Sequence, residues 1–378
     1  MGVVDHGRVP RDPPNAAMLL QPTTPLRVGL AGLGRFGQLH ASVLSSLPEV
    51  ELRAIADVDP VRLATVGERL GVGRRYCDAQ SLIEATDLDA LVFATPDEQH
   101  LEQGLAALAT GKAVLMEKPL APTWRQASRL QQLAEANGAL LQVGLILRYD
   151  LPHALLQRQI AAGDFGELIS IRSQRNCTAA SFGAIANRVH TVYRTLIHDI
   201  DLLLWLTGSH ATSVMALERR LGDQLSPEGC FALIRLANGQ VGQLESSWFV
   251  PDQAPANVVS DHWLGCIDAE LAVVGTRQTA RLRWLDGPLQ VWGPQRQLSP
   301  DTSLWPQLDG RIHGALREEL RDFVASARSG KASTVASLPQ AVEGLRIAEA
   351  IIEASRSGTV VPLAADQPAL TLRDGPTG

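Results

Sequence analysis

The chain has 378 residues, 45% of them hydrophobic, and a net charge of -6 at pH 7. This length is too great for one small core and favours two domains of about 100 to 200 residues each. The negative charge offers no basic surface for nucleic acid or anionic lipid, and no run of about 18 or more apolar residues marks a membrane span. We therefore expect a globular protein whose partners are neither nucleic acids nor membranes.

The first 25 residues are rich in proline and lack the apolar core of a signal peptide. They predict a disordered leader, residues 1–25, in which Met18 is an alternative start, and residues 366–378 form a predicted tail. The four cysteines are far apart, show no CxxC spacing, and suit buried thiols in a reducing cytoplasm. No cluster of His, Cys and carboxylate residues has metal-ligand spacing, so we expect no metal.

From Leu26 to about residue 147, short apolar runs alternate with longer amphipathic segments, which is typical of a parallel sheet crossed by helices. Right-handed crossovers then predict a doubly wound α/β domain over residues 26–148, with ligand sites at the carboxyl ends of its strands. The predicted strands are Arg27 to Ala31, Glu51 to Ala56, Ala90 to Ala94, Ala113 to Met116 and Leu140 to Leu145. The predicted helices are Phe36 to Leu47, Pro60 to Leu70, Asp97 to Ala109 and Trp124 to Ala136.

Residues 149–365 show a different pattern, in which strands separated by hairpin turns such as Ala237-Asn238-Gly239 predict a large, open, mainly antiparallel sheet. Helices are expected to cover one face, which makes this a second, α+β domain. The predicted strands are Leu168 to Arg175, Ser213 to Glu218, Cys230 to Leu236, Val241 to Phe249, Ala269 to Val274 and Ala280 to Trp284. The predicted helices are Pro152 to Ala161, Val189 to Leu206, Arg311 to Ala327 and Pro339 to Ser355.

The turn after the first strand carries the glycine spacing of a dinucleotide-binding Rossmann domain. Gly32 allows the tight turn, Gly34 lets a pyrophosphate approach the backbone, and Gly37 lets helix and strand pack closely. The helix that begins at Arg35 and Phe36 offers unpaired amides and a positive dipole end to the phosphates. The pattern predicts a bound nicotinamide dinucleotide, although the same glycines occur in ordinary strand-to-helix turns.

Asp57 ends the second strand, where a carboxylate can accept hydrogen bonds from the ribose hydroxyls of the adenosine. Its charge would repel the 2′-phosphate of NADP and therefore favours NAD. Arg53 and Arg62 lie close in the sequence, so NADP is not excluded.

Five features in a fixed order, spread over Leu26 to Leu363, resemble the Gfo/Idh/MocA family of oxidoreductases. They are GLGRFG at residues 32–37, Asp57, TPDEQH at 95–100, GKAVLMEKPLA at 111–121 and HDIDLLLWLTG at 198–208. The resemblance implies an NAD(P)-dependent dehydrogenase or reductase that acts on a secondary alcohol or ketone of a sugar, nucleotide sugar or cyclitol. It also implies a homo-dimer or homo-tetramer, and it leaves an alternative, since some relatives are catalytically idle regulators.

The same resemblance implies that Lys118 reaches the reacting hydroxyl, and a lysine at the carboxyl end of a strand would point into the cofactor crevice. His198 is the second candidate, because imidazole can take a hydroxyl proton. The alternatives are a solvated surface lysine and a satisfied core histidine. Asp201, three residues after His198, is its expected local partner, with capping or anchoring of the helix as the alternative for Asp199 and Asp201. Glu117 is expected to contact the nicotinamide end or to orient Lys118, with structural pairing alone as the alternative.

Arg194 is a departure from the family pattern, which often has an aspartate four residues before the histidine. The arginine reverses the local charge, favours a neutral His198, and could bind a carboxylate or phosphate of the substrate. Tyr193 and His190 are candidates for a compensating acid or base, with packing or capping as the alternative.

Further candidates follow from their positions at strand ends and loops. The predicted substrate-binding residues are Arg148, Arg175, Asn176, Arg194 and Trp248, with a salt bridge between the domains as the alternative for Arg148. The predicted cofactor-binding residues are Gly32, Gly34, Arg35, Phe36, Gly37, Asp57, Thr95, Pro96, His100 and Glu117, with a structural hydrogen bond as the alternative for His100. Lys118 and His198 complete the predicted site, whose substrate is a small polyol or sugar-like molecule.

Overall fold

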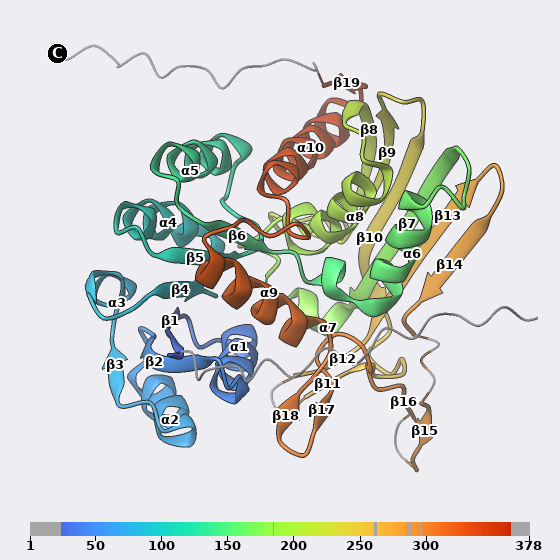
Figure 1. Cartoon of the computed structure of the whole chain (residues 1–378). Coiled ribbons are helices and arrows are strands. Elements are labelled where there is room, and N and C mark those ends of the chain that lie inside the picture. The colour runs from blue at the N-terminus through green and yellow to red at the C-terminus, as the bar shows by residue number, and fades with distance from the viewer. Residues whose placement is uncertain are drawn as a thin grey trace, which may run out of the picture.

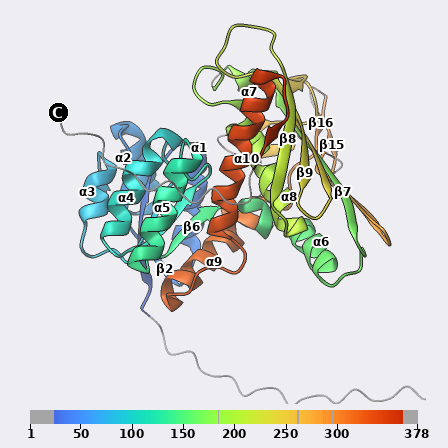
Figure 2. The same ribbon diagram turned by 90° about the horizontal axis from the view of Figure 1, so that it is seen from above.

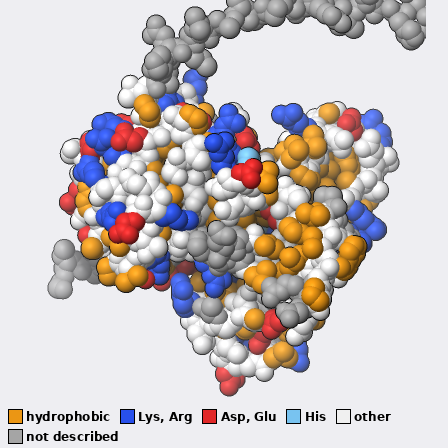
Figure 3. All heavy atoms as spheres, turned by 90° about the horizontal axis from the view of Figure 1, so that it is seen from below, with side chains coloured by type: hydrophobic (Ala, Val, Ile, Leu, Met, Phe, Trp, Pro, Cys, Tyr) orange, Lys and Arg blue, Asp and Glu red, His pale blue; other side chains and the backbone are white. Residues whose placement is uncertain are grey.

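The computed structural model describes residues 24–363 except 184, 261–262, 286, 288 and 295–296. Almost all of the predicted leader, the alternative start at Met18 and the predicted tail lie outside the described residues. Two sheets divide the molecule into two lobes (Figures 1 and 2). Seen from below, the surface is hollowed between the lobes, and hydrophobic side chains gather over the C-terminal lobe on the right (Figure 3).

The first lobe contains a six-stranded parallel sheet in the order β3-β2-β1-β4-β5-β6. This order reverses between β1 and β4, which confirms the predicted doubly wound topology and places a crevice at that point. The strands are β1 Leu26–Ala31, β2 Val50–Ala56, β3 Arg74–Tyr76, β4 Ala90–Phe93, β5 Ala113–Glu117 and β6 Leu141–Gly144. The helices are α1 Arg35–Ser46, α2 Pro60–Leu70, α3 Ala79–Glu84, α4 His100–Ala109 and α5 Trp124–Asn137.

Two elements of this lobe were not predicted, β3 and α3. The strand is three residues long and reads Arg-Arg-Tyr, so it has no apolar run that marks a strand. The helix has six residues, too few to show helical periodicity, although Asp78 caps it by accepting a hydrogen bond from the amide of Ser81 at 2.7 Å.

The second lobe contains a seven-stranded sheet in the order β14-β13-β7-β10-β9-β8-β19. Only the neighbours β7 and β10 are parallel, and the other described pairs are antiparallel, which confirms the predicted mainly antiparallel sheet. Its strands are β7 Leu168–Thr178, β8 Ala211–Arg219, β9 Gly229–Leu236, β10 Val241–Val250, β13 Ile267–Gly275, β14 Thr279–Arg283 and β19 Val361–Pro362. The helices are α6 Leu151–Ala161, α7 Ala179–Phe182, α8 Ile197–Thr207, α9 Ala315–Ser329 and α10 Leu338–Ser357.

Two predicted helices begin later than expected. The segment from Val189 is irregular at first, Val192–Leu196 forms a π-helical turn, and only then does α8 begin. The helix predicted from Arg311 begins at Ala315, because Arg311–Ile312 pairs as a strand and Gly314 turns the chain at φ 76°. The unpredicted short strands pair as β11 Val258–Ser260 with β12 Trp263–Gly265, β15 Val291–Trp292 with β16 Gln297–Leu298, and β17 Gln307–Leu308 with β18 Arg311–Ile312.

The last two helices join the lobes. α10 packs against α5 of the first lobe and against α8 and β8 of the second, while α9 packs against α1 (Figure 2). Helices α6, α8 and α10 lie on one face of the seven-stranded sheet (Figure 1). The carboxyl ends of the parallel strands therefore face the start of α8 across the junction between the lobes.

Candidate active site

The glycine turn has the shape that a dinucleotide requires. Gly32 has φ 86°, and a Cβ there would lie 2.5 Å from the carbonyl oxygen of Ala94. At Gly37 a Cβ would lie 1.9 Å from the oxygen of Gly32, so helix and strand can approach only without a side chain. Around Gly34 a Cβ would meet no atom within 4 Å. The open space at Gly34, at the N-terminus of α1, fits a pyrophosphate.

Asp57 is buried behind this turn. One of its carboxylate oxygens accepts a hydrogen bond from the amide of Leu33 at 2.6 Å, and Arg62 lies 3.2 Å from both oxygens. Arg53 is the other arginine because of which NADP was not excluded. Its side chain pairs with Glu51 and Asp87 and not with Asp57. A carboxylate is thus held beside the glycine turn, where a ribose would lie.

Lys118 follows β5 and reaches from the first lobe to the second. Its Nζ donates a hydrogen bond to the main-chain carbonyl of Arg194 at 2.9 Å, and its peptide bond to Pro119 is cis. Burial, followed by the charge of Arg194, lowers the pKa of this half-buried amine to about 7. Lys118 can therefore exchange a proton near neutral pH, as an acid-base catalyst must.

His198 stands in the first turn of α8, directly after the π-helical turn. Burial, and then the charges of Lys118 and Arg175, lower its pKa well below 6.5, so the imidazole is neutral at pH 7. The π-helical turn has the main-chain amide of Ile197 bonded to the oxygen of Val192, five residues back. Such turns are frequent at functional sites, because they change which face of a helix a side chain occupies.

Two buried aspartates beside His198 bind arginines instead of the histidine. Asp199 accepts hydrogen bonds from Nε and Nη2 of Arg175 at 2.9 and 3.0 Å. Asp201 accepts hydrogen bonds from Nε and Nη2 of Arg148 at 3.0 and 2.6 Å. The expected pairing of Asp201 with His198 is therefore wrong. Arg148 is only 2% exposed and forms the interdomain salt bridge that was its alternative.

Asn176 and Arg175 lie on opposite faces of the sheet, because side chains alternate along β7. The Asn176 amide donates a hydrogen bond to Glu245 at 3.1 Å and accepts one from Ser247 at 2.9 Å, both on β10. Arg175 faces α8, whereas Asn176 faces away from it, so the expectation that both residues line one pocket is not met.

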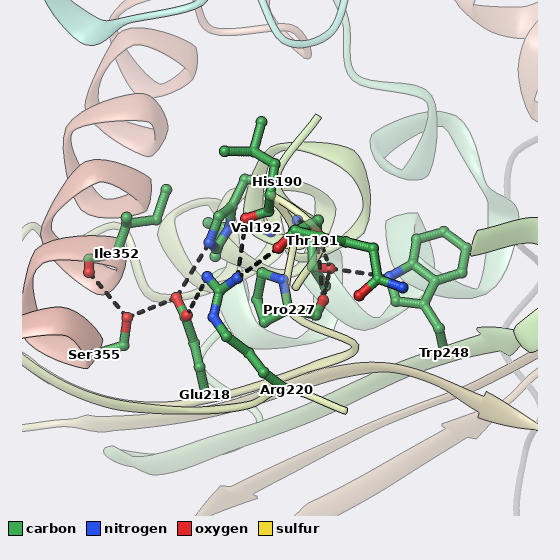
Figure 4. Close-up of polar contacts among 12 residues, drawn as sticks. His190, Thr191, Val192, Glu218, Arg220, Pro227, Trp248, Ile352 and Ser355 are labelled. Atoms are coloured by element: carbon green, nitrogen blue, oxygen red, sulfur yellow. Dashed lines mark hydrogen bonds and ion pairs between the residues drawn. The ribbon is translucent and has the colours of Figure 1, made fainter. Parts of the chain in front are cut away.

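The side chains of Trp248 and His190 support the π-helical turn. The Trp248 indole donates a hydrogen bond to Thr191 Oγ1 at 3.0 Å and packs in a small cluster with Phe182. Figure 4 shows His190 facing Glu218, which it bonds at 3.1 Å and which in turn accepts a hydrogen bond from Ser355 at 2.6 Å. His190 and Trp248 thus anchor the segment that carries Arg194.

Tyr193 is the other residue proposed as a compensating acid or base. Burial, and then the charge of Glu349, raise the pKa of its phenol above its ordinary value. Its electrostatic neighbours Glu349 and Arg356 both belong to α10, so the phenol lies on that side and not beside Lys118.

The loop after β4 is held by its histidine. His100 places Nδ1 2.8 Å from the carbonyl oxygen of Pro119 and Nε2 3.0 Å from that of Thr95. The Thr95 hydroxyl donates a hydrogen bond to Gln103 at 2.6 Å. His100 therefore connects the loop that begins at Thr95 and Pro96 to the turn that carries Lys118. This is the structural hydrogen bonding that was the alternative to cofactor binding by His100.

Glu117 belongs to a buried group of ionisable residues that the sequence did not reveal. Its carboxylate lies 2.8 Å from His40 Nε2, and its second oxygen accepts the amide of Lys118 at 3.2 Å. Glu319 of α9 is buried nearby, and among the described residues neither of its oxygens has a partner. Burial, and then the charge of Glu117, raise its pKa well above 4.5. The sequence does contain a sign that His40 is buried here, since this histidine lies on the same buried side of α1 as Gly37.

A cavity of about 330 Å³ lies beside the site, between α6, β7, β13, β14 and the loop at residues 300–303. Arg175 and Trp284 line it, and the Arg175 guanidinium stacks 4.7 Å from the centre of the Trp284 ring. Lys118 and His198 are not among its lining residues, so the cavity meets the site only at Arg175.

Comparison with known proteins agrees with this arrangement. The model of the oxidoreductase family with an NAD-binding Rossmann fold matches residues 26–145, and the model of its C-terminal alpha/beta domain matches residues 157–363. The chain belongs to the Gfo/Idh/MocA oxidoreductase family. It is 31% identical to inositol 2-dehydrogenase of Pseudomonas fluorescens over 364 residues, 91% of this chain and 99% of the relative.

The chain is also similar to a second inositol dehydrogenase and to a solved structure. The scyllo-inositol 2-dehydrogenase (NAD(+)) of Bacillus subtilis is 26% identical over 349 residues, 89% of this chain and 96% of the relative. The structure of scyllo-inositol dehydrogenase from Lactobacillus casei with NAD(H) and scyllo-inositol has a TM-score of 0.76 at 23% identity, covering 90% of this chain and 99% of that one. It has the same fold.

The described part of this Gfo/Idh/MocA chain also bears on membrane spans, metal sites and cysteines. No helix there is long and apolar enough to cross a bilayer. Within the same residues, no group of three or more His, Cys, Asp or Glu side chains is placed to hold a metal ion. The four cysteines are free thiols, of which Cys77 alone is exposed.

Proposed function

We propose that this chain is an NAD-dependent dehydrogenase that oxidises a secondary alcohol of a cyclitol or sugar-like polyol. The observation that carries the proposal is the contact of Lys118 Nζ with the carbonyl of Arg194, which brings the lysine of one lobe to the helix start of His198 in the other. The relatives named above act on inositols, which supports a polyol of similar size.

The cofactor would lie across the carboxyl ends of the parallel strands. The open space at Gly34 and the N-terminus of α1 fit the pyrophosphate, Asp57 fits the ribose, and Glu117, at the end of β5, would lie toward the nicotinamide. When bound, NAD supplies the ring that accepts a hydride from the carbinol carbon. Arg35, Phe36, Thr95 and Pro96 stay predicted cofactor neighbours.

Lys118 and His198 have different roles at the substrate hydroxyl. The pKa of Lys118, about 7, leaves much of the amine neutral, so Nζ can accept the hydroxyl proton as the hydride departs. His198, with its pKa well below 6.5, is a poor proton acceptor but can hydrogen-bond the same oxygen and orient it. Arg175, fixed by Asp199, keeps α8 in place against β7.

Reduced-nicotinamide absorbance during incubation with NAD and a panel of inositols and sugars tests this proposal. We expect Lys118→Ala and His198→Ala each to lower kcat/KM by about 10²- to 10⁴-fold and to leave NAD affinity unchanged. Arg129→Gln, at an exposed position on α5, is the matched control and should behave as the unaltered enzyme. NAD binding without turnover of any polyol would instead favour the idle regulator.

We also propose a cytoplasmic homo-oligomer that assembles through the sheet face opposite α8. On that face Met215 pairs with Leu233 and Leu217 with Phe231 in register, and these four side chains are between 41% and 67% exposed. A continuous exposed apolar surface of this kind is typical of a subunit interface. The cytoplasmic assignment rests on the free thiols.

A further inference from the structure

Arg194 is an arginine whose guanidinium has no partner in the part of the chain that the structure describes. Its side chain is exposed to the cleft, and within the described residues its guanidinium makes no hydrogen bond and no ion pair. Charged side chains that lose part of their hydration are normally paired. An unpaired guanidinium at this position therefore suggests a missing anionic partner.

The guanidinium lies between the two lobes. Its electrostatic neighbours are Cys177 at the end of β7 together with Asp97 and Glu117 of the first lobe. Asp97 follows β4 and Glu117 ends β5, so both belong to the edge of the sheet where the cofactor and substrate would meet. Arg194 thus lies beside the edge of the sheet where the reacting centre would form, and its side chain is exposed there.

Two of the charged groups around Arg194 already have partners, and Asp97 is the carboxylate that remains beside the positive charges of Lys118, Arg188 and Arg194. Arg175 is bound by Asp199, and Glu117 is bound by His40. Lys118 donates to a neutral carbonyl oxygen, and the charge of the exposed Arg188 adds to that of Arg194. The cleft therefore has an excess of positive charge.

From this geometry we infer that the substrate carries an anionic group, a carboxylate or a phosphate ester, which Arg194 binds while the reacting hydroxyl faces Lys118 and His198. The inference rests on the proposed function. A planar guanidinium binds either group through paired hydrogen bonds, and a lysine would not replace it fully. A neutral inositol would leave Arg194 unpaired, so this chain should differ in substrate from the inositol dehydrogenases that it resembles.

The cofactor phosphates are a less suitable partner for Arg194. They are expected at Gly34 and the amides that begin α1, whereas Arg194 neighbours the carboxyl ends of β4 and β5. The nicotinamide end carries no phosphate. A loss of NAD affinity on removal of Arg194 would overturn the inference.

The experiment compares matched pairs of polyols that differ in one anionic group: glucose with glucuronate, and myo-inositol with myo-inositol 1-phosphate. We expect the enzyme to prefer the charged member of at least one pair. Arg194→Gln should raise KM for that member about 10- to 100-fold, because a hydrogen-bonded charge is lost, and should change KM for the neutral member much less. Arg194→Lys should recover part of the loss, and Arg129→Gln should change neither value.

A second readout does not require turnover. Glucuronate or myo-inositol 1-phosphate is titrated into the complex with reduced cofactor, and the change in nicotinamide fluorescence gives its affinity. We expect a weaker affinity in Arg194→Gln, at an unchanged melting temperature. The carboxylate and phosphate arms identify which anion is recognised.

The outcomes separate the two proposals. Neutral polyols preferred in both pairs, or equal effects of Arg194→Gln on charged and neutral members, would overturn the anionic substrate and leave the dehydrogenase intact. Anion binding that depends on Arg194 without oxidation of any polyol would overturn the dehydrogenase and support the anion site. If neither anion binds in either readout, the inference is wrong.

Discussion

Lys118 shows how a single side chain acquires its chemistry from its surroundings. A solvated lysine is protonated at neutral pH, but burial and the charge of Arg194 lower the pKa of Lys118 to about 7. His198 is shifted in the same direction, to well below 6.5, and stays neutral. The lysine, with its pKa near the working pH, is therefore the better proton acceptor of the two.

The rate of alcohol oxidation should therefore follow the neutral form of Lys118. Because the lowered pKa makes the amine neutral above pH 7, kcat/KM should rise with pH through about 7 and then level off. Arg194→Gln removes a charge that lowers this pKa, so the rise should move to higher pH. The measurement is kcat/KM between pH 5.5 and 9, and a flat profile would remove Lys118 from the proton transfer.

Two glycines in one turn allow cofactor binding to be separated from folding. Gly34→Ala should fold normally, since its Cβ meets no atom within 4 Å, but should weaken NAD binding at least tenfold because the methyl group occupies the space for the pyrophosphate. Gly37→Ala should destabilise the protein, because its Cβ would lie 1.9 Å from the oxygen of Gly32. Thermal melting and NAD titration distinguish them, and equal melting temperatures would contradict this account.

At the scale of elements, the start of α8 depends on packing more than on its own sequence. Apolar periodicity predicts a regular helix from Val189, but the structure contains a π-helical turn at Val192–Leu196. Contacts from outside the helix hold this turn, namely Glu218 to His190 and Trp248 to Thr191 (Figure 4). Periodicity reports which residues are buried and carries no information about such distant contacts.

The buried pair of Arg148 and Asp201 should be a major joint between the segment after β6 and α8. Arg148→Met leaves the buried Asp201 charge unpaired and should lower the free energy of unfolding by about 3 to 5 kcal/mol. Arg53→Met, which breaks the solvent-exposed pairs of this arginine with Glu51 and Asp87, should cost much less. Urea unfolding measures both, and equal costs would show that burial of the Arg148 pair is unimportant.

At the scale of the whole molecule, the second sheet has two different faces. Helices cover one of them, and the opposite face exposes apolar side chains on β8 and β9 in register. Figure 3 shows hydrophobic side chains gathered on the same lobe. Residues 24–363, as far as the structure describes them, leave these side chains uncovered, which is why we propose that a second copy covers them.

A charge at the centre of this apolar face should dissociate the oligomer. Leu233→Glu buries a carboxylate in the proposed interface and should shift the mass in solution to that of one chain. Leu155→Glu, at an exposed position of α6, is the control and should leave the mass unchanged. Light scattering after gel filtration gives both masses, and a monomeric unaltered protein would refute the interface.

Local features of the sequence predicted much of the fold. The glycine turn, the alternating apolar runs and the order of the strands on either side of residue 148 are short-range patterns, and the structure confirms the two sheets that they imply. The polar strand β3 and the two-residue strands were not predicted, since they have too few apolar residues to form a pattern. The position of Asp57 beside the glycine turn followed from spacing alone.

By itself the sequence determined the Rossmann turn, the two-sheet architecture and the presence of a lysine at a strand end, because neighbours along the chain specify each of these. Only the tertiary structure decided that Arg148 binds Asp201, that Asn176 faces away from α8, and that the Arg194 guanidinium has no partner among the described residues. These outcomes depend on groups brought together from distant parts of the chain, whose packing no local pattern encodes. The unpaired charge of Arg194 is one of them.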